Sequence, residues 1–263
     1  MNLFITGASS GIGNALAHEY AKRCSGSRTN IGLAARRSEH LQRLATELQS
    51  LYKITCAIYP LDVRDSAALE TSAQDFIARF GAPDIVIANA GVSRGTLTEY
   101  QEDIAAFQAI MDINVMGMMH TFQPFIAAMK LAGHGQLVGV ASVAGVRGLP
   151  GSGAYSASKA AVISYLESLR VEMQALNIHV STIAPGYIRT PMTEINRYKM
   201  PFLMDVDVFA HKFANAVEDK TRFKVIPWQM GWVARLMRLI PPWLWDLLMK
   251  NMPHKKRLDW DWL

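Results

Sequence analysis

Seven short apolar runs are spaced along most of the chain, with longer segments of helical periodicity between them. Several runs are uniformly apolar, which is typical of strands covered on both faces. This alternation predicts an α/β fold: a doubly wound parallel sheet of about seven strands with helices on both faces and a ligand at the carboxyl ends of the strands. The expected strands are residues 3–5, 30–34, 54–59, 84–88, 136–141, 179–184 and 223–226.

Composition is consistent with one domain. The chain has 263 residues, half of them hydrophobic, which is enough for one large core, and no low-complexity linker interrupts it. Cys24 and Cys56 are the two cysteines and have no metal-ligand spacing, so we expect no metal site and reduced thiols in a cytoplasmic compartment. The first apolar run begins near the start of the sequence and leaves no room for a signal peptide, which also favours the cytoplasm.

A glycine-rich segment, T-G-A-S-S-G-I-G at positions 6–13, directly follows the first apolar run. A helix-like segment follows it in turn, so backbone N–H groups and a helix N-terminus can face a pyrophosphate there. Glycines by themselves also serve ordinary tight turns. Their place between an expected strand and an expected helix favours a dinucleotide site.

Tyr155 and Lys159 lie four residues apart in Y-S-A-S-K, thirteen residues after Ser142. Residues at this spacing share one face of a helix, so the Lys159 ammonium can lie beside the Tyr155 hydroxyl and favour its ionised form. Ser142 arrives from the end of a separate strand. A surface pair on a helix is the alternative interpretation, because this spacing also occurs by chance.

Several motifs occur in a fixed order: the glycine-rich turn, Asp62, N-A-G at 89–91, Asn114, Ser142, the Tyr155/Lys159 pair and P-G-Y-I-R-T at 185–190. In this order the chain resembles a single-domain short-chain dehydrogenase/reductase from about residue 2 to residue 226. The resemblance implies a Rossmann-type catalytic domain over 1–226 and an oxidoreductase that transfers hydride between a nicotinamide cofactor and a carbonyl or alcohol.

The resemblance also implies roles for four residues. Tyr155 donates a proton to the carbonyl oxygen, and Ser142 stabilises the charge that develops there. Lys159 lowers the pKa of Tyr155 and hydrogen-bonds the nicotinamide ribose. Asn114 holds a water that links Lys159 to solvent. The alternative interpretation of Asn114 is an ordinary buried amide that satisfies backbone groups.

The cofactor choice follows from A-A-R-R at 34–37, where a carboxylate would bind the 2′-hydroxyl of NAD. No carboxylate is present, and a guanidinium can bind a 2′-phosphate, so we predict NADP(H) with Arg36 as the main contact and Arg37 as a helper. A solvated charge is the alternative for Arg37. The cofactor-binding residues expected from the resemblance and from this argument are Gly7, Ser9, Ser10, Gly11, Ile12, Gly13, Arg36, Arg37, Asp62, Val63, Asn89, Ala90, Gly91, Tyr155, Lys159, Pro185, Gly186, Ile188 and Thr190.

Residues 191–207 follow the last of these motifs and are apolar for a surface segment. Met192, Met200, Phe202, Leu203 and Met204 lie in this range, which fits a mobile lid over an apolar substrate such as a long-chain or cyclic ketone or aldehyde. The alternative is that these side chains pack onto the body whether or not a substrate is bound.

Residues 227–263 form a tail of different composition, which we expect to be helical. All six tryptophans lie in it, and from residue 221 onward eight basic and three acidic side chains carry the whole net charge of +5. Basic residues beside Trp and Leu suit contact with the inner face of an anionic membrane, and the uncharged stretches are too short to span one. Covering the substrate cleft or forming a subunit interface are the alternatives. A nucleic-acid partner is not expected.

Two functions are compatible with these residues. The first is an NADP(H)-dependent reductase or dehydrogenase that forms a homodimer or homotetramer, an assembly implied by the resemblance, with residues 152–176 as the pairing helix. The second is a dinucleotide-binding sensor or scaffold with little turnover, recruited through its tail. The intact set of Ser142, Tyr155, Lys159 and Asn114 favours the first, because a pure binder needs no path for a proton.

Overall fold

Seven parallel strands form one sheet in the computed structural model of the protein, which describes residues 1–194, 196, 199–255 and 257. The sheet has the order β3-β2-β1-β4-β5-β6-β7. The predicted doubly wound α/β fold is confirmed, and each predicted strand boundary lies within one residue of the observed one. The strands are β1 (Asn2–Thr6), β2 (Asn30–Ala35), β3 (Thr55–Pro60), β4 (Ile85–Ala88), β5 (Gly135–Val140), β6 (Ile178–Pro185) and β7 (Phe223–Ile226).

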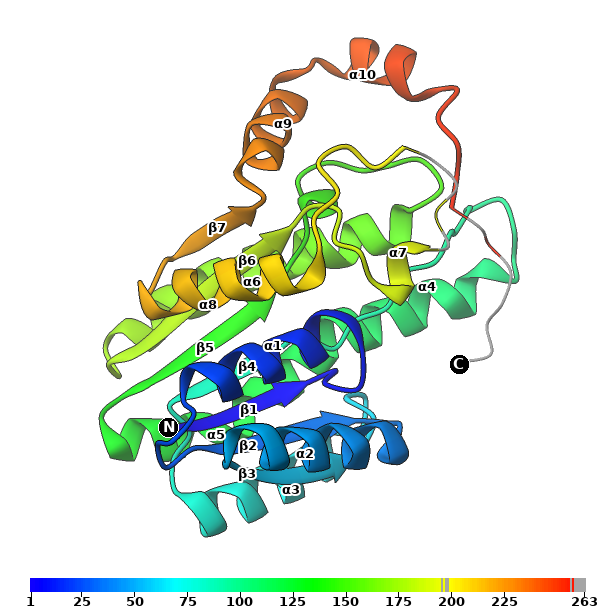
Figure 1. The fold of residues 1–263 in the computed structure, drawn as a ribbon. Helices are drawn as coiled ribbons and strands as arrows, with labels where there is room; N and C mark the ends of the chain where they lie inside the picture. Colours follow the sequence, from blue (N-terminus) through cyan, green and yellow to red (C-terminus); the bar gives the residue numbers. More distant parts are fainter. Residues whose placement is uncertain (195, 197–198, 256, 258–263) are drawn as a thin grey trace.

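Helices cover both faces of the sheet, as Figure 1 shows. One apolar core lies between the sheet and α1, α2 and α8, and a second lies between the opposite face and α3, α5 and α6. The connecting elements are α1 (Gly11–Arg23), α2 (Ser38–Tyr52), α3 (Ser66–Phe80), α4 (Asp103–Met111), α5 (Gly117–Ala132), α6 (Gly153–Gln174), α7 (Pro191–Glu194), α8 (Val206–Glu218), α9 (Trp228–Leu239) and α10 (Pro242–Met249).

The strand order reverses at β1, which pairs with β2 on one side and with β4 on the other. Connections on the two sides of this point leave in opposite directions, so a crevice opens at the carboxyl ends of the strands. Asn89, directly after β4, fixes the width of this crevice, because its amide nitrogen donates hydrogen bonds to the carbonyls of Thr6 and Gly7 after β1 (3.0 and 3.3 Å). The fold therefore brings the glycine-rich turn and the N-A-G segment together.

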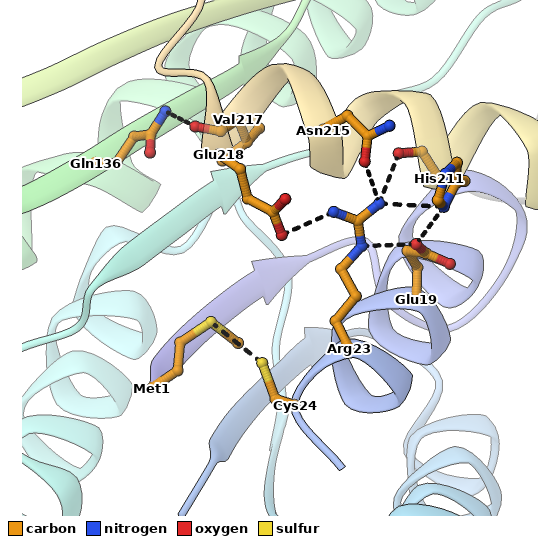
Figure 2. Close-up of polar contacts among 9 residues, drawn as sticks. All are labelled: Met1, Glu19, Arg23, Cys24, Gln136, His211, Asn215, Val217 and Glu218. Carbon is orange, nitrogen blue, oxygen red and sulfur yellow. Dashed lines mark hydrogen bonds and ion pairs between the residues drawn. The ribbon is translucent and has the colours of Figure 1, made fainter. Parts of the chain in front are cut away.

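A polar network joins α1 to α8 at the rim of the first core (Figure 2). The Arg23 guanidinium contacts the carboxylates of Glu19 and Glu218, each at 2.7 Å, and donates to the carbonyl of His211 and the side chain of Asn215. The His211 ring lies 2.9 Å from Glu19. Burial raises the pKa of Glu19, but the contacts with Arg23 and His211 outweigh it and hold that pKa below its usual value. Arg23 thus neutralises two carboxylates while it links two helices.

A π-helical segment, Asp112–Met116, interrupts the helix that runs from α4 into α5. A π segment adds one residue to a turn and so rotates the side chains that follow it. Asn114 lies inside this segment and is fully buried beneath the crevice.

The tail folds against the body through α9 and α10, at the top of Figure 1 beyond the end of β7. Met230 and Ala234 of α9 pack in a small core with Val143. Trp245 of α10 is buried, and the Arg147 guanidinium lies 4.4 Å from its ring centroid. Among the described residues, no helix combines the length and the apolar character that crossing a bilayer requires.

Candidate active site

One cleft at the carboxyl ends of the strands collects the predicted site residues. Its volume is about 380 Å³, within the range of ligand pockets. Asn114 and Gly13 lie behind its wall, and every other predicted catalytic or cofactor-binding residue lines it. Of the apolar side chains named for the predicted lid, Met192 lines the cleft. Sequence reasoning did not name the lining residues Ala35, Leu61, Val92, Ile113, Val140, Ala141, Pro191 and Thr193 individually.

The glycine-rich turn forms the end of the cleft nearest β1. Gly13 has no room for a side chain, because a Cβ there would lie 2.2 Å from the Gly7 carbonyl oxygen. The first turn of α1 can therefore pack directly on the turn. Ser10 caps this helix without a side-chain hydrogen bond to it, and no acidic residue lies in the first turn. The positive end of α1 faces the cleft, as an anionic phosphate requires.

Two arginines, Arg36 and Arg37, follow β2 and line the cleft. Arg37 donates hydrogen bonds to the hydroxyls of Ser9 and Ser10 (2.9 and 2.7 Å), so it braces the glycine-rich turn. Arg36 lies 3.9 Å from the Asp62 carboxylate, and its side chain is nearly half exposed. The alternative for Arg37 was a solvated charge without a specific contact. Its hydrogen bonds to Ser9 and Ser10 argue against that alternative.

Asp62, after β3, is the carboxylate closest to this cationic rim. Arg64 binds it through two nitrogens at 3.1 and 2.9 Å. Burial raises the pKa of Asp62, but the hydrogen bonds from Arg64 outweigh this and hold the pKa below its usual value. The negative charge of Asp62 is thus balanced by two guanidinium groups, those of Arg36 and Arg64.

Tyr155, in the first turns of α6, and Ser142, after β5, meet in the inner part of the cleft. Their hydroxyls lie close enough for Ser142 to influence the ionisation of Tyr155. The Ser142 hydroxyl also accepts a hydrogen bond from the backbone N–H of Ala144 (3.1 Å), which fixes its rotamer. Burial raises the pKa of Tyr155, and the contact with Ser142 opposes that rise.

Lys159 lies one turn beyond Tyr155 and is almost completely buried. Its ammonium donates to the Val140 carbonyl (2.9 Å) and lies 5.9 Å from the centroid of the Tyr155 ring. Burial lowers the pKa of Lys159 to about 8. The sequence predicts that Lys159 lowers the pKa of Tyr155; in this arrangement burial dominates and the pKa of Tyr155 lies above its usual value. The Lys159 ammonium is directed at the Val140 carbonyl instead of the Tyr155 hydroxyl. The contact with Ser142 is what opposes the rise in the pKa of Tyr155.

Asn114 makes the contacts of a buried amide that satisfies backbone groups, which was the alternative to a water-holding role. Its side-chain oxygen accepts from the Val92 N–H (2.8 Å), and its nitrogen donates to the Val92 carbonyl (3.0 Å) and to the Ser158 hydroxyl (2.9 Å). Ser158 in turn donates to the Tyr155 carbonyl. Sequence reasoning missed Ser158, which links Asn114 to the helix that carries Tyr155 and Lys159.

The segment after β6 also lines the cleft, and its Thr190 lies against Gly11 of the glycine-rich turn. Ile188 forms an isolated bridge with Met204, so both ends of the predicted lid are joined at its base. The Thr193 hydroxyl donates to the Ile188 carbonyl and holds the first turn of α7 against Thr190. Met192 faces the cleft from this turn, and part of the predicted lid, residues 195, 197 and 198, lies outside the described residues.

The end of the tail returns to the body beside Tyr155, in line with the cleft-covering alternative for the tail, but no local sequence signal predicts which residues make the contact. The Lys255 ammonium lies 2.6 Å from the Ser93 hydroxyl and 5.0 Å from the centroid of the Tyr155 ring. Arg257 binds the buried carboxylate of Asp103. These residues lie 100 or more positions away from the motifs they approach, so no local pattern links them.

Comparison with curated proteins gives relatives over most of the chain. An uncharacterized oxidoreductase of Myxococcus xanthus is 35% identical over 248 residues, which cover 94% of this chain and 96% of that protein. The 11-beta-hydroxysteroid dehydrogenase 1A of Arabidopsis thaliana is 33% identical over 192 residues, which cover 73% of this chain and 53% of the plant protein.

Solved structures share the fold. A short-chain dehydrogenase from Sphingobium yanoikuyae in complex with NADPH has a TM-score of 0.78 at 23% identity and covers 98% of both chains. A short chain dehydrogenase from Mycobacterium paratuberculosis bound to NAD has a TM-score of 0.75 at 23% identity, over 86% of this chain and 95% of that one. The family model described as short chain dehydrogenase matches residues 2–200. The chain therefore belongs to the short-chain dehydrogenase/reductase family of oxidoreductases.

Proposed function

We propose that the protein is an NADP(H)-dependent oxidoreductase that interconverts an apolar ketone or aldehyde and its alcohol. The observation that carries the proposal is the meeting of Tyr155, Ser142 and Lys159 in the same cleft as the glycine-rich turn. A proton donor, a group that stabilises an oxyanion and a phosphate-binding helix end then lie in one cleft. This combination suits hydride transfer to or from a carbonyl carbon.

The residues divide the chemistry in a simple way. When bound, a nicotinamide cofactor supplies the hydride in reduction and accepts it in oxidation. Tyr155 donates its hydroxyl proton to the carbonyl oxygen in reduction, and Ser142 donates a hydrogen bond to that oxygen as it gains charge. The positive charge of Lys159, 5.9 Å from the Tyr155 ring centroid, favours the phenolate that remains after proton transfer.

The charge distribution at the end of β2 supports NADP(H) over NAD(H). Arg36 and Arg37 line the cleft where a carboxylate would otherwise bind the ribose, and the nearest carboxylate, Asp62, is balanced by Arg36 and Arg64. A 2′-phosphate would therefore meet positive charge. The structural neighbour in complex with NADPH agrees with this proposal, and the neighbour bound to NAD marks the competing choice that an experiment has to decide.

The mouth of the cleft supports an apolar substrate. Met192 lines it, and Phe202, further along the same segment, is about half exposed. Apolar side chains held open at a cleft mouth can cover an apolar ligand and remove that surface from water. The hydroxysteroid dehydrogenase among the relatives, whose name refers to a large apolar alcohol, points in the same direction.

The direct test is NADPH consumption by the purified protein across matched ketones and aldehydes, from short and water-soluble to long-chain and steroid-like. We expect rates that rise with apolar size and a much weaker response with NADH. Highest rates with the short compounds would contradict an apolar pocket. Equal kcat/KM with NADH and NADPH would contradict the cofactor assignment.

Tyr155→Phe separates this function from a dinucleotide-binding sensor. The substitution removes the proton donor and leaves the ring, so we expect turnover to fall by roughly 10²- to 10⁴-fold while NADPH still binds. Turnover and NADPH binding can be measured in parallel, the latter by nucleotide fluorescence. A variant with unchanged turnover would contradict the proton-donor role. Absence of turnover in both proteins, with tight NADPH binding, would favour the sensor.

The outer surface of the tail supports a second part of the proposal, contact with the cytoplasmic face of an anionic membrane. Trp228, Trp232, Leu236 and Leu239 share one exposed face of α9, and Trp243 is exposed on α10. Arg235 lies 5.1 Å from the Trp232 ring centroid on the same face. Aromatic rings beside arginines suit the headgroup region of a bilayer. Trp260 and Trp262, which belong to the same predicted feature, lie outside the described residues.

We also propose a homo-oligomer that pairs through the outer face of α6. This helix has 22 residues, and Val171 on it is more than half exposed, so the face offers apolar surface to a second copy. Light scattering across protein concentration tests it. A monomer at all concentrations would contradict it.

A further inference from the structure

The chain that follows α10 returns to the body beside Tyr155, which lines the cleft. We call this segment, residues 250–255 and Arg257, the C-terminal strap; in Figure 1 it is the red stretch that runs down from α10. His254 packs on Gly151, where a Cβ would lie 2.6 Å from the His254 Cβ. Arg257 binds Asp103 through its Nε at 2.9 Å and lies 3.4 Å from the centroid of the Tyr100 ring. Contacts on both sides of Lys255 therefore hold that residue in place.

Lys255 brings a positive charge to Tyr155. Its ammonium donates to the Ser93 hydroxyl at 2.6 Å, and it lies closer to the centroid of the Tyr155 ring than Lys159 does (5.0 against 5.9 Å). Burial lowers the pKa of Lys255 to about 8, and the positive charge of Arg94 contributes to the same shift. Lys255 is partly buried, so its ammonium has lost part of its hydration.

Arg94 is the second cation of this group. It follows Ser93 directly, and its Nε is buried with no hydrogen-bond partner among the described residues. Within the described part of the chain, neither Arg94 nor Lys255 forms an ion pair with a carboxylate. Both side chains are partly buried, and two neighbouring cations without a counter-charge repel each other. An anion placed between them would relieve that repulsion.

We propose that Lys255 and Arg94 bind a carboxylate of the substrate, and that the protein acts on oxo acids or hydroxy acids with an apolar chain. The inference rests on the proposed oxidoreductase function and specifies its substrate class. Because Lys255 contacts the same ring that delivers the proton, the carboxylate lies within a few bonds of the reacting carbonyl. The apolar chain then extends toward Met192 at the mouth of the cleft.

Lys255 is a specificity-determining residue in this scheme, because only a substrate with a carboxylate would gain from its charge. A charge-assisted hydrogen bond contributes about 1.5–3 kcal/mol, which corresponds to roughly a 10- to 150-fold change in affinity. Lys255→Met keeps the length and apolar stem of the side chain and removes the charge. Lys250→Met is the matched control, because Lys250 is an exposed lysine of the same strap.

The first measurement is calorimetric binding of octanoate and of its neutral analogue octanamide to the protein saturated with NADP⁺. Octanoate should bind Lys255→Met at least about tenfold more weakly than it binds the wild type or Lys250→Met, whereas octanamide should bind all three alike. Equal octanoate affinity in Lys255→Met and the wild type would overturn the proposal. So would a parallel loss for octanamide, which would indicate a packing role alone.

Turnover of a 3-oxo acid and of its methyl ester tests the same idea on the reaction. Lys255→Met should raise KM for the acid and leave KM for the ester unchanged. Because Lys255 also lies 5.0 Å from the Tyr155 ring centroid, a change in kcat caused by the loss of its charge should be the same for acid and ester. If the wild type reduces no carbonyl compound at all, the oxidoreductase function fails, and the octanoate binding still decides whether the anion site exists. If turnover is present but the acid has no advantage over the ester, the anion site fails and the oxidoreductase function stands.

Discussion

At the scale of single residues, Lys159 is a buried ammonium whose native position opposes folding. Its pKa of about 8 lies below the value of about 10.4 that an unfolded chain has. Between these two pH values the unfolded chain binds more protons than the native one, so the free energy of unfolding rises with pH across this window. Below pH 8 the full unfavourable effect of burying the charge is present. Function, not stability, explains why a charge is held there.

Lys159→Met should therefore stabilise the protein while it abolishes turnover. At pH 7 we expect the free energy of unfolding to rise by about 1–3 kcal/mol, less than the full pKa shift implies because the hydrogen bond to the Val140 carbonyl is lost. The stability difference between Lys159→Met and the wild type should shrink between pH 8 and 10, because native Lys159 loses its charge as pH rises through about 8. Urea denaturation of the cofactor-free protein measures it, with exposed Lys212→Met as the control. A variant less stable than the wild type at pH 7 would show that the ammonium stabilises the fold.

Arg36 and Arg37 make different contacts, so their substitutions should differ. Arg36→Asp places a carboxylate where a 2′-phosphate would bind and should weaken NADPH binding by at least about tenfold while NADH binding changes little. Arg37→Met removes the brace on Ser9 and Ser10 and should weaken both nucleotides alike. Fluorescence titration with each nucleotide gives the dissociation constants. Equal losses for NADPH and NADH in Arg36→Asp would argue against a phosphate contact.

Site residues could be predicted from the sequence where the chemistry has a local pattern. The Tyr155/Lys159 pair is such a case, because a spacing of four on a helix fixes relative position. Lys255 is the opposite case: it reaches Tyr155 after the chain has passed through α9 and α10, and its surroundings in the sequence resemble a solvated basic run. Its position depends on tertiary packing that no periodicity encodes.

At the scale of elements, the Arg23 network shows how one side chain can couple two helices. Arg23→Met leaves the Glu19 and Glu218 carboxylates without their shared cation, and Glu19 is largely buried. We expect the free energy of unfolding to fall by about 1–3 kcal/mol, because hydrogen bonds to charged groups are lost at a partly shielded site.

The matched control for Arg23→Met is Arg43→Met, since Arg43 pairs with Glu39 on α2 in an exposed arrangement at 3.9 Å. Such pairs contribute about 0–1 kcal/mol, so the control should be nearly neutral. Thermal or urea denaturation of both variants at pH 7 gives the comparison. Equal losses in the two variants would mean that the α1 to α8 network adds nothing beyond a surface ion pair.

Elements were predictable where burial imposes a regular pattern. Strands covered on both faces leave continuous apolar runs, and the seven runs match the seven strands to within one residue at each end. The π segment at Asp112–Met116 was not predictable, because one extra residue in a turn leaves the apolar content of the helix unchanged. The contacts of Asn114 with Val92 and Ser158 are formed from within that segment.

At the scale of the whole molecule, charge and apolar surface are concentrated in the same part of the chain. Residues 1–220 have equal numbers of basic and acidic side chains, and the net charge of +5 belongs to the residues that follow. The helices α9 and α10 lie at the carboxyl end of the sheet, where the cleft opens, and the C-terminal strap continues from them to Tyr155. A surface bound by these helices would therefore lie on the same side of the molecule as the cleft. That arrangement suits an apolar substrate that enters from a membrane.

Sedimentation with vesicles tests this arrangement. The wild type should sediment with phosphatidylserine-containing vesicles at low salt and be released as salt rises, because the attraction is partly electrostatic. Trp232→Ser combined with Leu236→Ser removes apolar side chains that are 58% and 61% exposed on α9, so this variant should remain in the supernatant with its fold intact. Leu131→Ser, at a side chain 90% exposed at the end of α5, should sediment like the wild type and serves as the control.

Three outcomes would contradict membrane contact. A wild type that stays in the supernatant at low salt excludes it directly. Equal loss of binding in Leu131→Ser would mean that any exposed apolar side chain contributes and that α9 has no special role. Self-association of the wild type without vesicles, abolished by the double substitution in α9, would assign the surface to a second copy of the chain, because that surface would then already be covered. Binding that needs both the anionic lipid and the α9 side chains is the result that places the cleft beside a bilayer.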